Sequence, residues 1–255
     1  MNYKFKMALL AVIFMSFQTK AQDTETVVDN IIKEAKENSQ LERLAHELLD
    51  VIGPRLTGTP QLKQANDWAV AQYTQWGIPA QNEKWGDWKA WERGITHIDM
   101  ISPRVQSLDG MQLAWSPSTG PKGITAEAVL VPTFNGKDDF TQWLKTIKGK
   151  FVMISQNQIT GRTDDNWKEF ATEESMEAMK ILRDSLTDLF KENLKKTGYS
   201  NWRGTGFNDE GIKLLEDSGA AGIVGSYWSR EIGSNKIFGT TTEKIPTIDI
   251  ELEDY

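Results

Sequence analysis

The chain has 255 residues, a formal net charge of −7 and hydrophobic residues at 39% of its positions. This composition is typical of a globular protein with one large domain or two modest ones. The acidic balance argues against electrostatic binding to nucleic acid or to an anionic membrane surface. The sequence contains no cysteine, which excludes structural disulfides, thiolate catalysis and cysteine-bound zinc.

The first 21 residues have the features of a targeting segment. Lys4 and Lys6 precede an apolar run at 7–17, which is too short to span a bilayer. Ala21 is a small residue of the type found at cleavage sites. We therefore expect 1–21 to be a cleaved signal peptide that directs the protein to the periplasm or out of the cell, with no membrane association afterwards.

Helix patterns dominate the next part of the chain, and a short loop at 52–60 joins two of them. Apolar residues recur at helical spacing over 26–37, 41–52 and 60–76. Gly53 is typical of a helix end and follows the pattern at 41–52. Thr59 followed by Pro60 is typical of a helix start and begins the pattern at 60–76. Arg55 is the only charge in the loop. Taken alone, the loop predicts an ordinary connection with a solvated arginine.

The second half predicts strands that alternate with helices. Short apolar runs bounded by Gly and Pro indicate strands, and a long amphipathic pattern over 173–196 indicates a helix. A shorter helix is expected after a cap at Asn208 or Asp209. The alternation predicts a small α/β layer. The expected strands are 95–102, 111–116, 125–132, 150–155, 220–226 and 245–250.

The loop 52–60 reads Ile-Gly-Pro-Arg-Leu-Thr-Gly-Thr-Pro and is followed by a helix that carries Asn66 and Trp68. This run resembles the N-terminal signature of secreted zinc exopeptidases of the aminopeptidase and plasma glutamate carboxypeptidase kind. In these enzymes a protease-associated domain is inserted into the catalytic domain. The order of motifs at 149–152, 218–224 and 245–250 resembles the core of such an inserted domain.

The resemblance implies an α/β fold in three parts. Residues 1–21 are the signal peptide, and 22–120 are the N-terminal part of a split peptidase domain. Residues 121–255 are the protease-associated domain, with a helical insertion at about 162–203.

The same resemblance implies hydrolysis of a terminal bond in peptide substrates at a site with two zinc ions. The family holds these ions with histidines and carboxylates that follow the inserted domain, and uses a glutamate as general base. Residues 251–255 look like the start of the helix that leaves the inserted domain. We therefore expect the ligands beyond the chain end and assign no catalytic or metal-binding residue. No zinc and no peptidase activity are expected of this chain alone. Binding residues, exo-specificity and oligomeric state stay open.

The sequence contains one segment that imitates a zinc motif. His97 and Asp99 form an H-x-D pair, and on a strand such side chains share one face. The only other histidine is His46, whereas zinc normally takes three or four ligands. We interpret His97 and Asp99 as a hydrogen-bonded pair and His46 as a solvated helix residue.

Tryptophans suggest a second function. An exposed row of indole rings could stack on sugars, so the alternative is a non-enzymatic secreted module that binds protein or glycan through the protease-associated domain or the tryptophan-rich region. Their uneven spacing favours instead a hydrophobic contact with the rest of a peptidase domain. Six of the ten tryptophans crowd the first half of the chain: Trp68, Trp76, Trp85, Trp88, Trp91 and Trp115.

Overall fold

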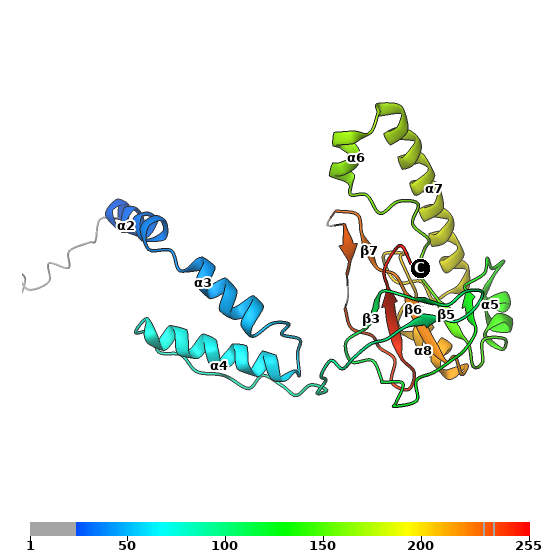
Figure 1. Cartoon of the computed structure of the whole chain (residues 1–255), viewed down its shortest axis with the longest axis horizontal. Helices are drawn as coiled ribbons and strands as arrows, with labels where there is room; N and C mark the ends of the chain where they lie inside the picture. The colour runs from blue at the N-terminus through cyan, green and yellow to red at the C-terminus, as the bar shows by residue number, and fades with distance from the viewer. Residues whose placement is uncertain (1–23, 232, 237) are drawn as a thin grey trace, which may run out of the picture. The chain divides into compact units, whose positions relative to one another are not determined.

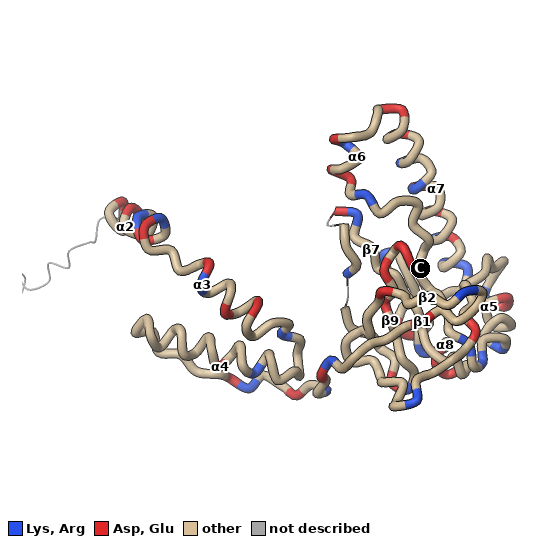
Figure 2. The backbone as a smooth tube through the Cα atoms, viewed as in Figure 1, with Lys and Arg blue, Asp and Glu red and all other residues tan. Residues whose placement is uncertain are grey.

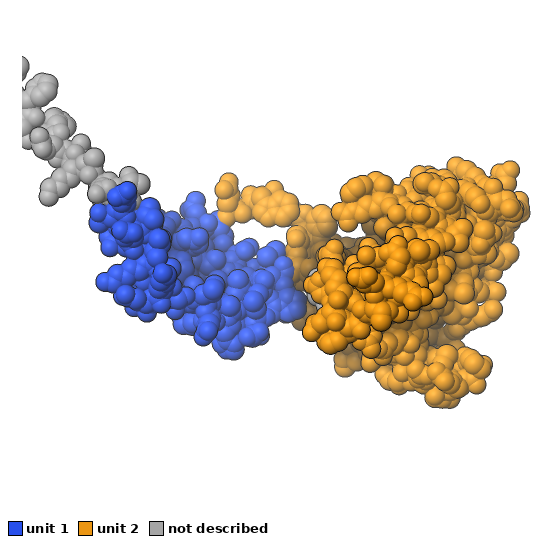
Figure 3. All heavy atoms as spheres, turned by 90° about the horizontal axis from the view of Figure 1, so that it is seen from above, with its two compact units in different colours: residues 1–55, 61–82 blue, residues 56–60, 83–255 orange. Residues whose placement is uncertain are grey.

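The computed structural model describes residues 24–231, 233–236 and 238–255, so the expected signal peptide lies outside the described residues. The chain divides into two compact units (Figure 3). The first comprises Met1–Arg55 and Gln61–Asn82, and the second comprises Leu56–Pro60 and Glu83–Tyr255. None of the helices in the described part of the chain has the length and hydrophobicity needed to span a bilayer.

Helices make up the described part of the first unit, as the apolar spacing predicts. The helix predicted at 41–52 changes type at His46, where the backbone widens into a π-helix. In this wider turn the amide of Ile52 donates to the carbonyl of Glu47, five residues back. The elements are α2 (Thr24–Glu37), α3 (Leu41–Ala45), the π-helix η1 (His46–Val51) and α4 (Pro60–Gln75) (Figure 1).

A glutamate joins η1 to α4. The indole N–H of Trp68 donates to one carboxylate oxygen of Glu47 at 2.7 Å, and Arg43 donates to the other at 2.7 Å. These two contacts, that of Trp68 first, lower the pKa of Glu47. Apolar residues of this unit such as Leu41 and Leu49 remain exposed. Polar contacts therefore help to hold these helices together.

Arg55 closes the end of η1 and is not the solvated residue that the loop alone predicts. Its guanidinium donates to the carbonyl of Leu48 at 2.7 Å and to that of Gly53 at 2.8 Å. Gly53 has a φ of +79°, the left-handed conformation expected at a helix end. A cation that binds the last carbonyls also complements the negative end of the helix dipole. The loop arginine is thus a structural clamp.

A mixed five-stranded sheet forms the centre of the second unit (Figure 1). Four strands run parallel, and β3 pairs antiparallel with β9 at one edge. This confirms the α/β fold, although each strand is shorter than predicted because the expected ranges include flanking turns. In spatial order the strands are β3 (Gly110–Gln112), β9 (Thr247–Ile250), β6 (Gly222–Gly225), β5 (Phe151–Met153) and β4 (Ala128–Leu130).

The sheet includes a strand from before the domain boundary predicted at 120/121. Gly110 of β3 lies opposite Ile250 of β9. The assignment of 121–255 to a protease-associated domain stays a prediction. Two short hairpins complete the strands of the unit: β1 (Asp99–Met100) with β2 (Gln106–Ser107), and β7 (Trp228–Ser229) with β8 (Ser234–Asn235).

Two helices of the second unit begin directly after residues whose side chains cap them. Thr172 accepts a hydrogen bond from the amide of Ser175, and Asn208 accepts one from the amide of Gly211. The segment 162–203 contains two helices, which an ion pair between Asp164 and Arg183 joins at 2.6 Å. One helix, α5, has no counterpart among the elements predicted from the sequence. The helices are α5 (Lys137–Leu144), α6 (Asp164–Phe170), α7 (Glu173–Thr197) and α8 (Asp209–Asp217).

The core packs sheet residues against side chains of α5, α7 and α8. Phe140 of α5 is fully buried, and its ring lies 5.4 Å from that of Phe134 and 5.7 Å from that of Phe207. Burial of each such side chain stabilises the fold by about 1.5–3 kcal/mol. The buried cluster includes Val152, Ile154, Leu194, Leu215 and Ile223.

Glu216 fixes the segment that enters β9. Its side chain is only 5% exposed, and one carboxylate oxygen accepts three backbone N–H groups. The donors are Glu243 at 2.9 Å, Lys244 at 2.6 Å and Ile245 at 3.2 Å. Charged acceptors form stronger hydrogen bonds than neutral ones. The last helix therefore sets where Pro246 and the following strand join the sheet.

We predict that Glu216→Ala lowers the free energy of unfolding by about 2–3 kcal/mol, because it leaves three backbone donors without their acceptor. Urea denaturation followed by circular dichroism measures the change. Glu243→Ala is the matched control, because its exposed side chain can be removed while its backbone donor stays. Equal stability of the two variants would contradict this role of Glu216.

Candidate functional site

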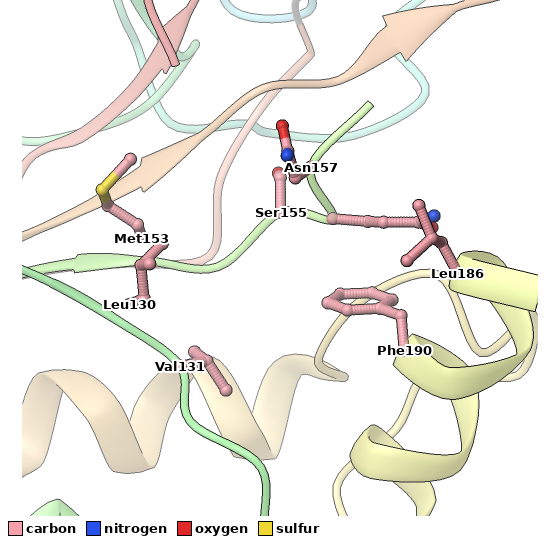
Figure 4. Close-up of a pocket in the computed structure, with 8 residues that line it drawn as sticks. Leu130, Val131, Met153, Ser155, Asn157, Leu186 and Phe190 are labelled. Atoms are coloured by element: carbon pink, nitrogen blue, oxygen red, sulfur yellow. The ribbon is translucent and has the colours of Figure 1, made fainter. Parts of the chain in front are cut away.

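A pocket of about 260 Å³ opens where β4 and β5 end (Figure 4). Parallel strands present their carboxyl ends at the same edge of a sheet, and α/β proteins commonly bind ligands there. Leu186 and Phe190 of α7 face residues that belong to the two strands or follow them (Figure 4). The lining residues are Leu130, Val131, Met153, Ser155, Gln156, Asn157, Leu186 and Phe190.

The pocket is uncharged. Its lining is apolar apart from one hydroxyl and two amides, and it includes no ionisable side chain. The Ser155 hydroxyl accepts a hydrogen bond from the amide of Ser226 at 2.8 Å. A serine nucleophile requires an adjacent base, which this lining does not supply. The arrangement suits an apolar group with a hydrogen-bonding end.

Tyr255 holds the segment that carries Ser155. Its hydroxyl accepts from the amide of Ser155 at 2.8 Å and donates to the carbonyl of the same residue at 3.1 Å. Burial raises the pKa of Tyr255 to about 12, so the phenol keeps its proton near neutral pH. The residues after β9 thereby position the polar side of the pocket.

Asp249 is a carboxylate buried in β9, with 1% of its surface exposed. One oxygen accepts the amide of Tyr227 at 2.9 Å, and the other accepts the side-chain amide of Asn235 at 2.6 Å. Burial raises the pKa of Asp249 to about 6, although these two hydrogen bonds favour the charged form. The carboxylate ties the β7–β8 hairpin to the central sheet.

The raised pKa of Asp249 predicts a stability that depends on pH. In an unfolded chain the carboxyl group of Asp249 has a pKa of about 3.9, so the folded protein binds the proton of this group more tightly. This tighter proton binding contributes fully to the free energy of unfolding below about pH 4. The contribution is lost as pH rises through about 6. We predict that Asp249→Asn removes this slope, measured as the free energy of unfolding between pH 4 and 7.

Asp139→Asn is the control for this experiment. Hydrogen bonds from Asn135 hold the pKa of Asp139 below its ordinary value, so its titration lies at the acid side of that interval. The slope should therefore persist in this variant. A wild-type slope that survives in Asp249→Asn would show that another group causes it.

Neither histidine belongs to the pocket lining, and each lies beside one carboxylate. His97 lies 2.8 Å from Asp99, as predicted for a hydrogen-bonded pair, although His97 itself precedes β1. His46 lies 2.9 Å from Asp50, and both side chains are exposed. Within the described ranges no group of three or more His, Cys, Asp or Glu residues could hold a metal. These pairs do not fit a two-zinc centre.

The tryptophans in the described part of the chain make several separate contacts. The rings of Trp88 and Trp115 meet edge to face at 77°, with centroids 6.0 Å apart. Trp68 donates to Glu47, and Arg93 lies over the ring of Trp91 at 4.8 Å. The glycan-binding alternative stays a hypothesis. The predicted hydrophobic contact with a further part of a peptidase domain stays a prediction.

Gly58 explains part of the signature loop in terms of packing. It has a φ of +80°, and a side chain there would collide with the carbonyl oxygen of Lys89 and contact the ring of Trp88. The second glycine of the loop is therefore required by backbone conformation and by close approach.

Sequence similarity supports the peptidase resemblance. No protein-family model matches the chain. Carboxypeptidase Q from Homo sapiens and from Pongo abelii are each 32% identical over 146 residues. The Mus musculus protein is 29% identical over 136 residues. The chain is similar to carboxypeptidase Q. The matched stretch covers 57% of this chain and 29% of the human relative, so the chain spans less than a third of the curated relatives it matches.

A solved structure supports the same relationship at the level of the fold. The crystal structure of a peptidase M28 precursor from Shewanella amazonensis superposes with a TM-score of 0.50 and 20% identity. It covers 90% of this chain and 45% of that chain. The resemblance to exopeptidases that the two groups of motifs predict is thus confirmed.

The sequence reasoning assigned no binding residue and overlooked the polar cluster around Asp249 and Tyr255. One signal was present, because Asp249 stands between isoleucines in a strand otherwise suited to burial. A charged residue at such a position requires hydrogen-bonding partners. Its partners Tyr227 and Asn235 follow no spacing that would identify them in advance.

Proposed function

We propose that this chain is part of a secreted zinc-dependent exopeptidase that hydrolyses peptides. The observation that carries the proposal is the similarity to carboxypeptidase Q over 146 residues. The likeness of fold to a peptidase M28 precursor over 90% of the chain is consistent with it. Secretion rests on the basic and apolar pattern of residues 1–21.

In this proposal the chain supplies scaffold, and other residues of the full-length enzyme bind the two zinc ions. His46 and His97 are the only histidines of the sequence, and each lies beside a single aspartate on the surface. The neutral pocket offers no general base. We assign the 255 residues no catalytic role, and place the ligands in a part of the family fold that this sequence does not include.

We predict that the purified 255-residue chain releases no amino acids from a library of dipeptides and tripeptides, with or without added zinc. Its tightly bound zinc, measured by mass spectrometry after dialysis, should be well below one ion per chain. A zinc-dependent release that His97→Ala abolishes would contradict the prediction and would assign the metal to the surface pair. His46→Ala serves as the matched variant.

An immunoblot of the native source tests the wider proposal. An antibody raised against this chain should detect a mature protein well above 28.9 kDa, the mass of the 255 residues. The immunoprecipitated protein should hydrolyse peptides, and a chelator should abolish the activity. A mature product slightly below 28.9 kDa with no such activity would overturn the peptidase proposal.

A further inference from the structure

The last strand of the central sheet has a free edge. β4 lies at one end of the strand order, and β5 is its single partner among the strands that the structure describes. The carbonyl of Glu127 and the amide of Val131 both bond to β5. Backbone groups of successive residues in a strand point to alternate sides. The N–H and C=O groups of Ala128 and Leu130 therefore point away from β5.

This edge is open and uncharged (Figure 2). Ala128 is exposed, and Leu130 keeps 66% of its surface accessible to solvent. Edge strands are often protected from further pairing by charged residues or proline, and β4 contains neither. Its outward backbone groups can therefore pair with another extended chain. Because β4 is short, backbone pairing alone would be weak, so recognition also requires a side-chain contact.

The pocket at the end of β4 and β5 provides that contact. Leu130 lines the pocket and also presents its backbone at the free edge. In the register of the sheet it lies opposite Met153, which lines the pocket as well (Figure 4). Residues directly opposite each other on neighbouring strands direct their side chains to the same face. A residue added opposite Leu130 would thus direct its side chain towards the pocket.

The lining selects an uncharged, apolar side chain. Leu186 and Phe190 contribute apolar surface from α7, and no lining residue is ionisable. A charged group placed there would lose hydration without gaining an ion-pair partner. The side-chain amide of Asn157 can both donate and accept a hydrogen bond, which suits the backbone of an incoming chain.

We propose that an extended peptide pairs antiparallel with the free edge of β4 and places one apolar side chain in the pocket. The peptide residue opposite Leu130 exchanges two backbone hydrogen bonds with it, as in a hydrogen-bonded antiparallel pair. The volume of about 260 Å³ is below the range of about 300–1,000 Å³ for drug-sized ligands, so a single side chain is the fitting occupant. This proposal does not depend on the peptidase assignment, because it requires binding and no cleavage.

Nuclear magnetic resonance of the isotope-labelled full chain tests the site with a capped peptide of five residues, acetyl-Thr-Ala-Leu-Ala-Thr-amide. We expect saturable binding that shifts the amide signal of Leu130 and slows its hydrogen exchange. The amide of Val129, which faces β5, should exchange at an unchanged rate. Absence of saturable binding up to about 1 mM peptide would overturn the proposal.

Two altered peptides separate the side-chain contact from the backbone contact without changing the protein. Aspartate in place of the central leucine should weaken binding by about tenfold or more, because the pocket offers no partner for a charge. N-methylation of the central leucine should weaken it as much, because it removes the N–H that pairs with the carbonyl of Leu130. Equal affinity of the N-methylated peptide would show that the side chain binds without strand pairing, against the proposal.

Variants of the chain complete the test. Leu186→Glu places a charge in the pocket lining and should weaken peptide binding by about tenfold or more. Leu189→Glu, on a residue of the same helix that is 64% exposed and outside the lining, is the matched control. Leu130→Pro removes an outward N–H at an edge position where proline is tolerated, and should also weaken binding. Equal loss in the two α7 variants, or full affinity of a folded Leu130→Pro chain, would contradict the proposed site.

Discussion

The architecture of the second unit depends on two buried carboxylates that fix one central strand, β9. Glu216 accepts hydrogen bonds from three backbone amides just before β9. Asp249 within that strand accepts hydrogen bonds from Tyr227 and Asn235. β9 in turn pairs with β6 on one side and β3 on the other. Buried residues specify the register of this strand. The two carboxylates add to this specification, because buried charges tolerate few alternative partners.

The pocket follows from the same arrangement. Tyr255 lies soon after β9, and its hydroxyl fixes the backbone of Ser155 at the end of β5. α7 supplies the opposite wall through Leu186 and Phe190. Ion pairing between Arg183 and Asp164 attaches α6 to this helix. The neutral, mostly apolar wall is consistent with a scaffold that binds, while the chemistry of a peptidase would need residues of a different kind.

Local sequence signals predicted the elements that depend on local physics. The 25-residue helix α7 was expected almost to the residue, because its apolar residues recur at helical spacing over 173–196. Asn208 likewise predicted α8. Contacts of individual side chains were not predictable in this way. The clamp of Arg55 on Leu48 depends on where carbonyls lie at the end of a π-helix, which apolar spacing does not reveal.

Local motifs were also insufficient to predict the candidate site. His97 and Asp99 matched a metal motif in spacing, yet they form an exposed pair without further ligands among the described residues. Asp249 matched no motif, and its significance comes from burial and from partners 14 and 22 residues away. Motifs identify relatives, whereas the geometry of a site depends on which distant residues the fold brings together.

The clamp of Arg55 has a consequence for how relatives of this protein are recognised. In the loop that resembles a peptidase signature, Arg55 is explained by its hydrogen bonds at a helix end. Gly58 is explained by the close approach of the Lys89 backbone. The local structure of the loop is therefore sufficient to explain both residues. A match to this loop identifies a well-formed joint between two helices, and an active site must be identified from its metal ligands.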